Sequence, residues 1–354
     1  MKTSAATPLS LPEQRPAGEP PEARGIKRDE VRLLVVGPGG FEHVIFRDVG
    51  RFLAPGDLLV VNTSRTVPAA VDAERDGQEI VVHFSARLND GSWTVELRAV
   101  DGSRPLLDGA GGEVIETAGG GRFEILGAYL GIEGRSRMQR VDVRVSDGSV
   151  EHYLARVGRP ISYSHVSERW PLSMYQTVFA RVPGSAEMPS AGRPFTHELV
   201  TQLVSRGLVL APVVLHAGVS SLEAGETPLP ERYRVPASTA RLVNHTREAG
   251  GRIVAVGTTV TRALESAADG DVVRPSEGWT DLVLDSERPS RVVDGLVTGW
   301  HAPDASHRWL LEAVAGRASV DGAYAAASEA GYLWHEFGDS CLLLPRRSRT
   351  DAEA

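Results

Sequence analysis

Residues 55–66 of the chain read PGDLLVVNTSRT. The first three residues are a turn signature, and the continuously apolar run Leu58–Val61 is typical of a parallel strand that is buried on both faces. The run ends abruptly in polar residues, from Asn62 to Arg65. Because open α/β sheets bind ligands at the carboxyl ends of their strands, this stretch predicts an α/β sheet with a polar site at one edge.

From about Thr66 the pattern changes to an alternation with a period of two residues. Residues 93–99 and 141–146 alternate between apolar and polar side chains, which is typical of half-buried antiparallel strands. Further short apolar runs lie between turns rich in Gly and Asp, and closely spaced short strands indicate a small barrel or sandwich. We therefore predict an inserted, all-β, barrel-like domain.

The predicted fold class is α/β, with a mostly parallel sheet domain that the β insert divides into two parts. Residues 1–23 are rich in Pro, Glu and Ala, and such segments bury too little apolar surface to fold. The predicted divisions are a disordered tail at 1–23, the first α/β part at 24–65, the β insert at 66–153, the second α/β part at 154–345 and a tail at 346–354.

The composition is that of an ordinary globular protein, with 354 residues of which 42% are hydrophobic and 24% charged. The single cysteine, Cys341, excludes a disulfide framework and a Cys-rich zinc site. No apolar run approaches the ~20 residues that span a bilayer, and no secretory leader is visible, so we expect a cytoplasmic enzyme without membrane contact. The net charge of −8 does not indicate nucleic-acid binding, although a local basic patch can lie on an acidic protein.

A loop rich in Pro and Gly, residues 175–196, reads YQTVFARVPGSAEMPSAGRPFT. Its Pro and Gly residues disfavour a helix or a central strand. The loop ends at Thr196, a good N-cap for a helix over His197–Arg206, and the free backbone N–H groups of that helix can hold an anion. The alternative is a proline-stiffened connection on the surface.

After residue 160 we predict further strands, among them Ile253–Val256, which leads into a helix over Val260–Ala267, and Leu282–Leu284. Polar residues follow several of these strands. If these strands are parallel, their carboxyl ends meet at one edge of the sheet and form a polar small-molecule site. The residues that would meet there are Asn62, Ser64, Arg65, His216, Thr258, Thr259 and His301. Each histidine can instead be a structural or surface group. The chain has no phosphate loop, nucleophile elbow or metal-spaced histidine cluster, so we predict no metal site.

Several blocks, taken together, resemble the S-adenosylmethionine:tRNA ribosyltransferase-isomerases of queuosine biosynthesis. They occur in the same order and at compatible spacing from about Arg28 to Leu344, nearly the whole predicted folded chain. The blocks are PGDLLVVNTSRTVPA (55–69), YQTVFA (175–180), PSAGRPFT (189–196), LHAGV (215–219), AVGTTVTRALES (255–266), GWTD (278–281), VDGL (293–296) and GD (338–339).

The resemblance implies a monomeric enzyme with an α/β domain and an inserted β-barrel. It implies transfer and isomerisation of the ribosyl group of S-adenosylmethionine onto 7-aminomethyl-7-deazaguanine in the anticodon stem-loop of tRNA. The products would be epoxyqueuosine-tRNA, adenine and methionine. S-adenosylmethionine would be consumed as a substrate, and no metal is implied.

Within this resemblance we predict that His216 and Glu231 transfer protons. His216 stands where a buried strand opens into Gly218, and Glu231 is the acid that remains where the family has a histidine-rich segment. The predicted substrate-binding residues are Asn62, Arg65, Tyr175, Gln176, Ser190, Ala191, Gly192, Thr196, Gly257, Thr258, Thr259, Asp281 and His301.

The chain departs from the family pattern in loops that would face the ligand. Pro194 replaces a histidine, Asp304 a lysine and Ala70 an arginine, and segment 226–231 lacks both histidines of its counterpart. Two alternatives therefore stay open. One is a divergent paralogue that uses S-adenosylmethionine with another acceptor. The other is a non-catalytic module of the same fold that binds a nucleoside or RNA.

Overall fold

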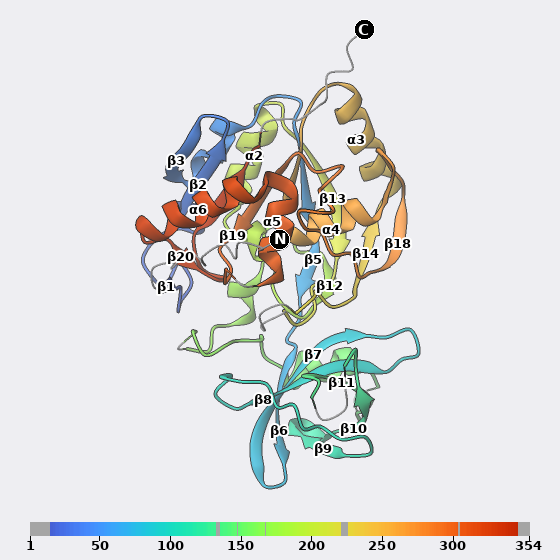
Figure 1. Ribbon diagram of the computed structural model, residues 1–354. Helices are drawn as coiled ribbons and strands as arrows, with labels where there is room; N and C mark the ends of the chain where they lie inside the picture. The colour runs from blue at the N-terminus through green and yellow to red at the C-terminus, as the bar shows by residue number, and fades with distance from the viewer. Residues whose placement is uncertain are drawn as a thin grey trace, which may run out of the picture.

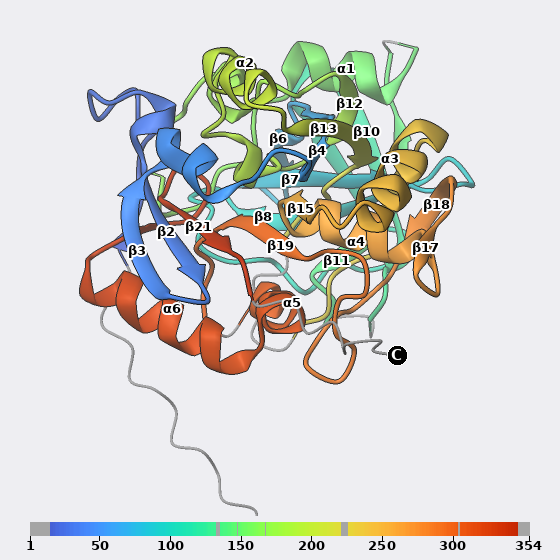
Figure 2. The same ribbon diagram turned by 90° about the horizontal axis from the view of Figure 1, so that it is seen from above.

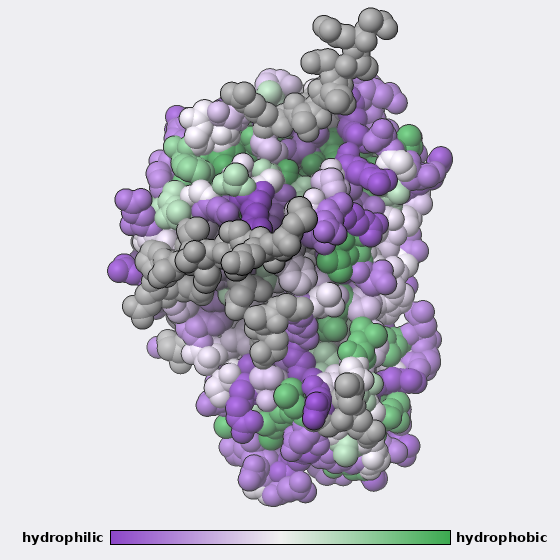
Figure 3. All heavy atoms as spheres, viewed as in Figure 1, coloured by the Kyte–Doolittle hydropathy of each residue, from purple (hydrophilic) through white to green (hydrophobic). Residues whose placement is uncertain are grey.

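The computed structural model describes residues 15–131, 135–146, 148–166, 168–220, 226–303 and 305–345. A sheet covered by helices forms the upper part of the molecule in Figure 1, and a β-barrel lies below it. Hydrophilic side chains predominate on the face seen in Figure 3, where apolar side chains gather in small groups. Among the described residues, no helix combines the length and the apolar character needed to cross a membrane.

The barrel is closed by six antiparallel strands in the order β10-β11-β8-β7-β6-β9. Side chains on alternate positions, such as Val82, Leu97 and Phe123, are buried in one apolar cluster. Helix α1 (Val150–Val157), capped by Ser149, packs on this cluster through Tyr153. The strands are β6 (Ala70–Arg75), β7 (Gln78–Arg87), β8 (Trp93–Ala99), β9 (Val114–Thr117), β10 (Gly121–Ala128) and β11 (Met138–Arg144).

The larger sheet has nine strands in the order β18-β14-β13-β4-β15-β19-β21-β2-β3. Its central strands β13, β4, β15 and β19 run parallel to one another, and antiparallel pairs occur toward both edges. The strands are β2 (Arg32–Gly37), β3 (Gly40–Ile45), β4 (Leu58–Asn62), β13 (Val209–Leu215), β14 (Glu231–Val235), β15 (Ile253–Val256), β18 (Ser276–Thr280), β19 (Gly295–Gly299) and β21 (Ser340–Leu343).

Both faces of this sheet are covered by helices, which explains the continuous apolar run of β4. Leu58 and Val60 pack in the same cluster as α3 to α6, whereas Leu59 and Val61 pack in the cluster that contains α2. Figure 2 shows α2 on one side of the strands and α5 and α6 on the other. The helices are α2 (His197–Ser205), α3 (Ala237–Glu248), α4 (Thr258–Ser266), α5 (Ser306–Ala315) and α6 (Arg317–Glu329).

Short elements connect these layers. The parallel pair β5 and β12 leads from the sheet to the barrel, and β1 pairs with β20. Their bounds are β1 (Arg15–Pro16), β5 (Ser64–Thr66), β12 (Val182–Ser185), β16 (Ala268–Asp269), β17 (Val272–Val273) and β20 (Leu333–Trp334), with 3₁₀ turns at Arg28–Glu30, Phe46–Phe52, Ala118–Gly120, Leu172–Tyr175 and Ser190–Gly192.

The predicted fold class, an α/β sheet domain with an inserted barrel-like domain, is confirmed. The domain boundaries that we predict stay a proposal, although the barrel strands fall between Ala70 and Arg144. Part of the predicted N-terminal tail is folded, because β1 pairs with β20 and Ala17 is buried. The predicted tail at 346–354, residues 1–14 and Asp304 lie outside the described residues.

Two element predictions near the site need correction. Leu282–Leu284, predicted as a strand, is irregular, and the strand is the preceding segment β18, which pairs with β14 through backbone hydrogen bonds. Helix α4 begins at Thr258 instead of Val260, because Gly257 has a φ of 100° and turns the chain directly from β15 into the helix. A backbone in this region is open to glycine and costly for other residues.

Candidate active site

A cavity of about 430 Å³ lies where the carboxyl ends of the central strands face the barrel. Its size is that of a small-molecule site. Walls come from both parts of the fold, with Arg98 and Gly102 on the barrel side and Gly257 and Thr298 on the sheet side. The remaining walls are loops around residues 160–165, 186–191, 217–220, 282–284, 301–307 and 335–336.

Many of the predicted site residues line this cavity although they come from distant parts of the sequence. They are Tyr175, Ser190, Ala191, Glu231, Gly257, Thr258, Thr259 and His301. A Cβ atom on Gly257 would lie 3.4 Å from Cβ of Ala191. Glycine at this position thus allows the chain to turn into α4 and allows the Pro/Gly-rich loop to approach the backbone closely.

Asn62 does not line the cavity, but its side chain links the segments next to it by hydrogen bonds. Its Nδ2 donates to the carbonyl of Leu215 at 2.8 Å and to Oγ1 of Thr259 at 3.2 Å. Its Oδ1 accepts from the backbone N–H of Ser64 at 3.0 Å and of Leu215 at 3.1 Å. The amide is therefore fully used in holding two strand ends and the start of α4 in place.

His216, predicted to transfer protons, is not among the residues that line the cavity, and its ring bonds to a neighbouring strand end. Its Nδ1 lies 2.8 Å from Oγ of Ser64, which in turn lies 2.6 Å from Oγ of Ser185. Burial, with the nearby charges of Arg232 and Arg234, lowers the pKa of His216 to about 4, so the ring is neutral at pH 7. The cavity wall is formed by the next residues, Ala217 and Gly218, and not by His216.

Gln176 and Thr196 are not among the residues that line the cavity, and the side chain of each bonds to the backbone. The side-chain amide of Gln176 donates to the carbonyl of Thr66 at 2.8 Å and accepts from its N–H at 3.3 Å. Thr196 caps α2 by accepting from the N–H of Leu199 at 3.0 Å, as predicted from the sequence. The side chain of Thr196 is therefore used in capping the first turn of α2.

Three further predicted substrate-binding residues also lie outside the cavity walls. Arg65 and Asp281 are exposed. Gly192 is buried against Thr177 and Phe179, which a Cβ atom there would approach to 3.3 and 3.5 Å. The strand-end argument located the edge of the sheet, but it could not tell which side chains turn toward the cavity.

Glu231, the first residue of β14, lines the cavity and is held on both carboxylate oxygens. Oε1 accepts from the N–H of Gly218 at 3.0 Å, and Oε2 pairs with Arg262 of α4. Burial raises the pKa of Glu231, and Arg262 and the Gly218 N–H oppose that rise. Arg262 also donates to the carbonyls of Thr280 and Leu282, so one ion pair fixes both the carboxylate and the loop beside it.

Glu187 is a second acid in the cavity wall, and it was not predicted. Its Oε1 accepts from the N–H of Ser220 at 2.9 Å and from the hydroxyl of Tyr163, and its Oε2 accepts from the hydroxyl of Ser220. Burial raises the pKa of the Glu187 carboxyl. The loop that carries it was singled out for its Pro and Gly residues, and nothing in that pattern marks this acid.

His301 lines the cavity beside His307, which was also not predicted. The two rings stack with centroids 4.0 Å apart and planes 10° from parallel. Burial lowers the pKa of His307 to about 4 and moves the pKa of His301 in the same direction. Both rings are therefore neutral at pH 7 and can donate or accept a hydrogen bond without adding charge.

Comparisons with known proteins agree on one family over nearly the whole chain. A sequence model of a family described as queuosine biosynthesis protein matches residues 8–343. The S-adenosylmethionine:tRNA ribosyltransferase-isomerase of Carboxydothermus hydrogenoformans is 34% identical over 345 residues, which are 94% of this chain and 97% of the relative. The protein of the same name from Symbiobacterium thermophilum is 36% identical over 348 residues, with the same coverage of 94% and 97%.

A solved structure gives the same result. The crystal structure of S-adenosylmethionine tRNA ribosyltransferase from Thermotoga maritima is 30% identical to the chain, with a TM-score of 0.50. The match covers 96% of this chain and 99% of that protein.

Proposed function

This chain belongs to the queuosine biosynthesis family of S-adenosylmethionine:tRNA ribosyltransferase-isomerases, and from that premise we propose that its cavity is where S-adenosylmethionine and the tRNA base react. The enzyme transfers and isomerises the ribosyl group of S-adenosylmethionine onto tRNA. The proposed acceptor is 7-aminomethyl-7-deazaguanine, and the proposed products are epoxyqueuosine-tRNA, adenine and methionine.

The observation that carries this proposal is the convergence of the family blocks on one cavity. Ser190 and Ala191, Glu231, and Gly257 to Thr259 belong to segments far apart in the chain and line the same space. Thr258 and Thr259 begin α4, and the N-terminus of a helix favours a negatively charged group such as the carboxylate of the methionine moiety.

In the proposed reaction the sulfonium acidifies the adjacent 5′ carbon, and a base removes a proton there. Loss of adenine, attack by the amine of the deazaguanine and departure of methionine follow. The cavity lies between the sheet and the barrel, and walls on both sides shield the reactive intermediates from water in this proposal.

We propose Glu231 as the group that transfers the proton. A base acts best when its pKa lies near the operating pH, and burial moves the pKa of Glu231 upward in that direction. Arg262 and the Gly218 N–H hold the carboxylate in one orientation. His216 acts through Ser64 and Ser185 on the backbone that carries Gly218, and is a positioning residue in this proposal.

The remaining parts of the proposal follow the family. The acceptor is the anticodon stem-loop of tRNA, the enzyme works as a monomer in the cytoplasm, and it consumes S-adenosylmethionine. Our prediction that the reaction needs no metal ion stays a prediction.

Adenine release tests the proposed function and separates it from the two alternatives. Purified protein is mixed with S-adenosylmethionine and an anticodon stem-loop that carries either 7-aminomethyl-7-deazaguanine or guanine, and adenine is quantified by chromatography. We expect adenine only with the modified base. Equal release in both arms would favour a paralogue with another acceptor, and no release in either arm would favour a binding module.

A further inference from the structure

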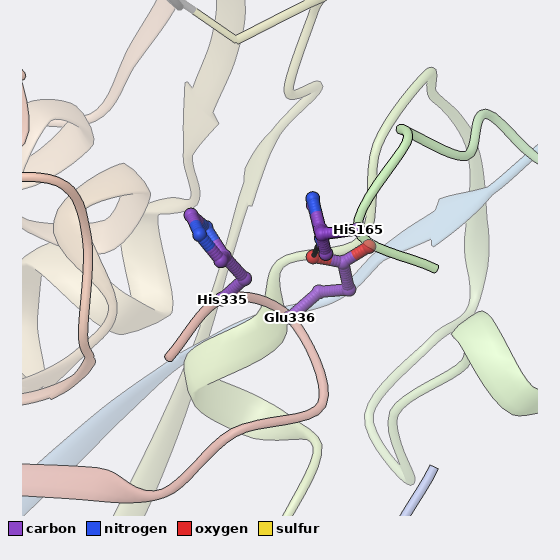
Figure 4. Close-up of side chains that lie close together, drawn as sticks. All are labelled: His165, His335 and Glu336. Atoms are coloured by element: carbon purple, nitrogen blue, oxygen red, sulfur yellow. Dashed lines mark hydrogen bonds and ion pairs between the residues drawn. The ribbon is translucent and has the colours of Figure 1, made fainter. Parts of the chain in front are cut away.

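Two histidines and a glutamate from two separate loops meet in the cavity wall. They are His165, His335 and Glu336, and Figure 4 shows their side chains converging from two segments of the chain. His165 Nε2 lies 2.9 Å from a carboxylate oxygen of Glu336. The rings of His165 and His335 stack with centroids 4.4 Å apart, and one nitrogen or oxygen atom from each residue lies within 4.8 Å of the others.

The backbone holds this cluster in an unusual conformation. His335 has a φ of 70°, a region that residues other than glycine occupy at a cost and that is concentrated at functional sites. Its N–H donates to the carbonyl of Trp300 at 2.9 Å, and its carbonyl accepts from Gly338 at 3.0 Å. The buried ring of Phe337 anchors the next turn. The conformation is thus fixed on both sides, and it directs consecutive side chains, His335 and Glu336, toward His165.

We propose that His165, His335 and Glu336 bind one divalent transition-metal ion, in contrast to the sequence-based prediction of no metal site. Two imidazoles and one carboxylate form a ligand set that zinc uses with an open fourth position. All three residues line the cavity, so the open position faces it. Imidazole ligands favour first-row transition metals over Mg²⁺ and Ca²⁺, which prefer oxygen.

The distances are compatible with a site that closes around the ion. Two ligand atoms bound tetrahedrally to one ion at about 2.1 Å each lie about 3.4 Å apart. The three ligand atoms lie within 4.8 Å of one another, so the widest pair has to close by about 1.4 Å at most. Small rotations of half-buried side chains provide such a movement, and the hydrogen bond between His165 and Glu336 already orients two of the ligands.

Metal binding can be measured without reference to turnover. Tag-free full-length protein, stripped with a chelator, is titrated with Zn²⁺ by calorimetry and with Co²⁺ by visible absorption. We expect one ion per chain. Loss of a group that only supports a metal ligand typically weakens binding 10- to 100-fold. Glu336→Gln and His335→Asn each remove a direct ligand, so each should weaken Zn²⁺ binding by about 100-fold or more. Asparagine is chosen at position 335 because it tolerates a positive φ.

His197→Asn is the matched control, because His197 is exposed on α2 and lies outside the cavity. It should keep the wild-type affinity, and thermal unfolding checks that each variant is folded. The proposal is wrong if the wild type shows no saturable Zn²⁺ binding. It is also wrong if Glu336→Gln, folded, binds Zn²⁺ as tightly as the wild type, since other groups would then hold the ion.

Discussion

Polar side chains at the strand ends divide into two groups by what they contact. Asn62, Ser64 and His216 bond to one another's strands, and none of them is among the residues that line the cavity. Glu187 and Glu231 line the cavity, and each is held by a backbone N–H and a side chain. The first group holds the strand ends in place, and the second group is the one that we propose to meet the substrate.

The proton-transfer role that we propose for Glu231 predicts a large loss of activity when its charge is removed. Glu231→Gln keeps the size of the side chain but cannot act as a base, so adenine release should fall by about 100-fold or more. Glu198→Gln, an exposed position on α2, is the control and should retain wild-type turnover. Near-normal release by folded Glu231→Gln would assign the base to another group, with Glu187 next to be tested.

The buried state of His216 predicts a pH-dependent loss of stability. Its pKa falls from 6.5 to about 4 on folding, so the unfolded chain binds the proton more tightly. The stabilisation is present above pH 6.5 and is lost as the pH falls toward 4, by up to about 3 kcal/mol. His216→Asn can still bond to Ser64 but does not titrate in this range.

Urea unfolding of both proteins from pH 7.5 to 4 measures this difference. The wild type should lose stability relative to His216→Asn as the pH falls. A constant difference across the range would show that the ring is not desolvated as described. His216→Asn should also keep more turnover than His216→Ala, because it preserves the bond to Ser64 that a positioning role requires.

At the level of elements, the sequence patterns identified regular structure more reliably than irregular structure. The apolar run at Leu58, the strand 253–256 and the Thr196-capped helix were all predicted and are present, because periodicity and capping are local properties. The apolar residues Leu282 and Leu284 were assigned to a strand, but they are buried in the cavity wall without strand pairing. A short irregular segment that is buried has the same apolar pattern as a short buried strand, so the sequence does not distinguish the two.

The cap of α2 gives a test at this scale. Thr196 was predicted to bind substrate, but it bonds to Leu199 and lies outside the cavity. Thr196→Ala should therefore lower the free energy of unfolding by about 1 kcal/mol, and Thr196→Ser should restore it. Both variants should keep wild-type KM for S-adenosylmethionine, and a raised KM in Thr196→Ala alone would return this residue to the site.

For the whole molecule, the sequence predicted the two-part architecture and the sheet edge that carries the site. It did not predict the residues that come from irregular loops, above all Glu187, His165, His335 and Glu336. These residues lie in loops without periodicity. They come together only because the barrel, the sheet and the loops between them pack around one cavity. Contacts between residues so far apart in the chain produce no regular spacing in the sequence, so the sequence pattern could not predict them.

The contact between barrel and sheet depends on a buried charge network. Arg137 of the barrel donates to Glu96 at 2.8 Å, to Glu226 at 2.9 Å and to the carbonyl of Ser220 at 3.0 Å. Removing one member of a buried pair leaves an uncompensated charge, so Arg137→Met should cost about 3 kcal/mol in urea unfolding.

Arg122→Met, at an exposed pair on the barrel, is the control and should change stability by less than about 1 kcal/mol. Equal effects of the two substitutions would contradict the importance of the Arg137 network. Because Ser220 also lines the cavity, Arg137→Met should in addition raise the KM for S-adenosylmethionine.

The central claim is that this cavity carries ribosyl transfer from S-adenosylmethionine to a modified tRNA base. The most direct measurement follows isotope labels placed separately in the ribosyl carbons and in the methyl group of S-adenosylmethionine, with mass spectrometry of the modified stem-loop. The account predicts that the ribosyl label enters the stem-loop, that the methyl label leaves in methionine, and that Glu231→Gln suppresses both. Methyl label in the stem-loop, or no label there at all, would contradict it.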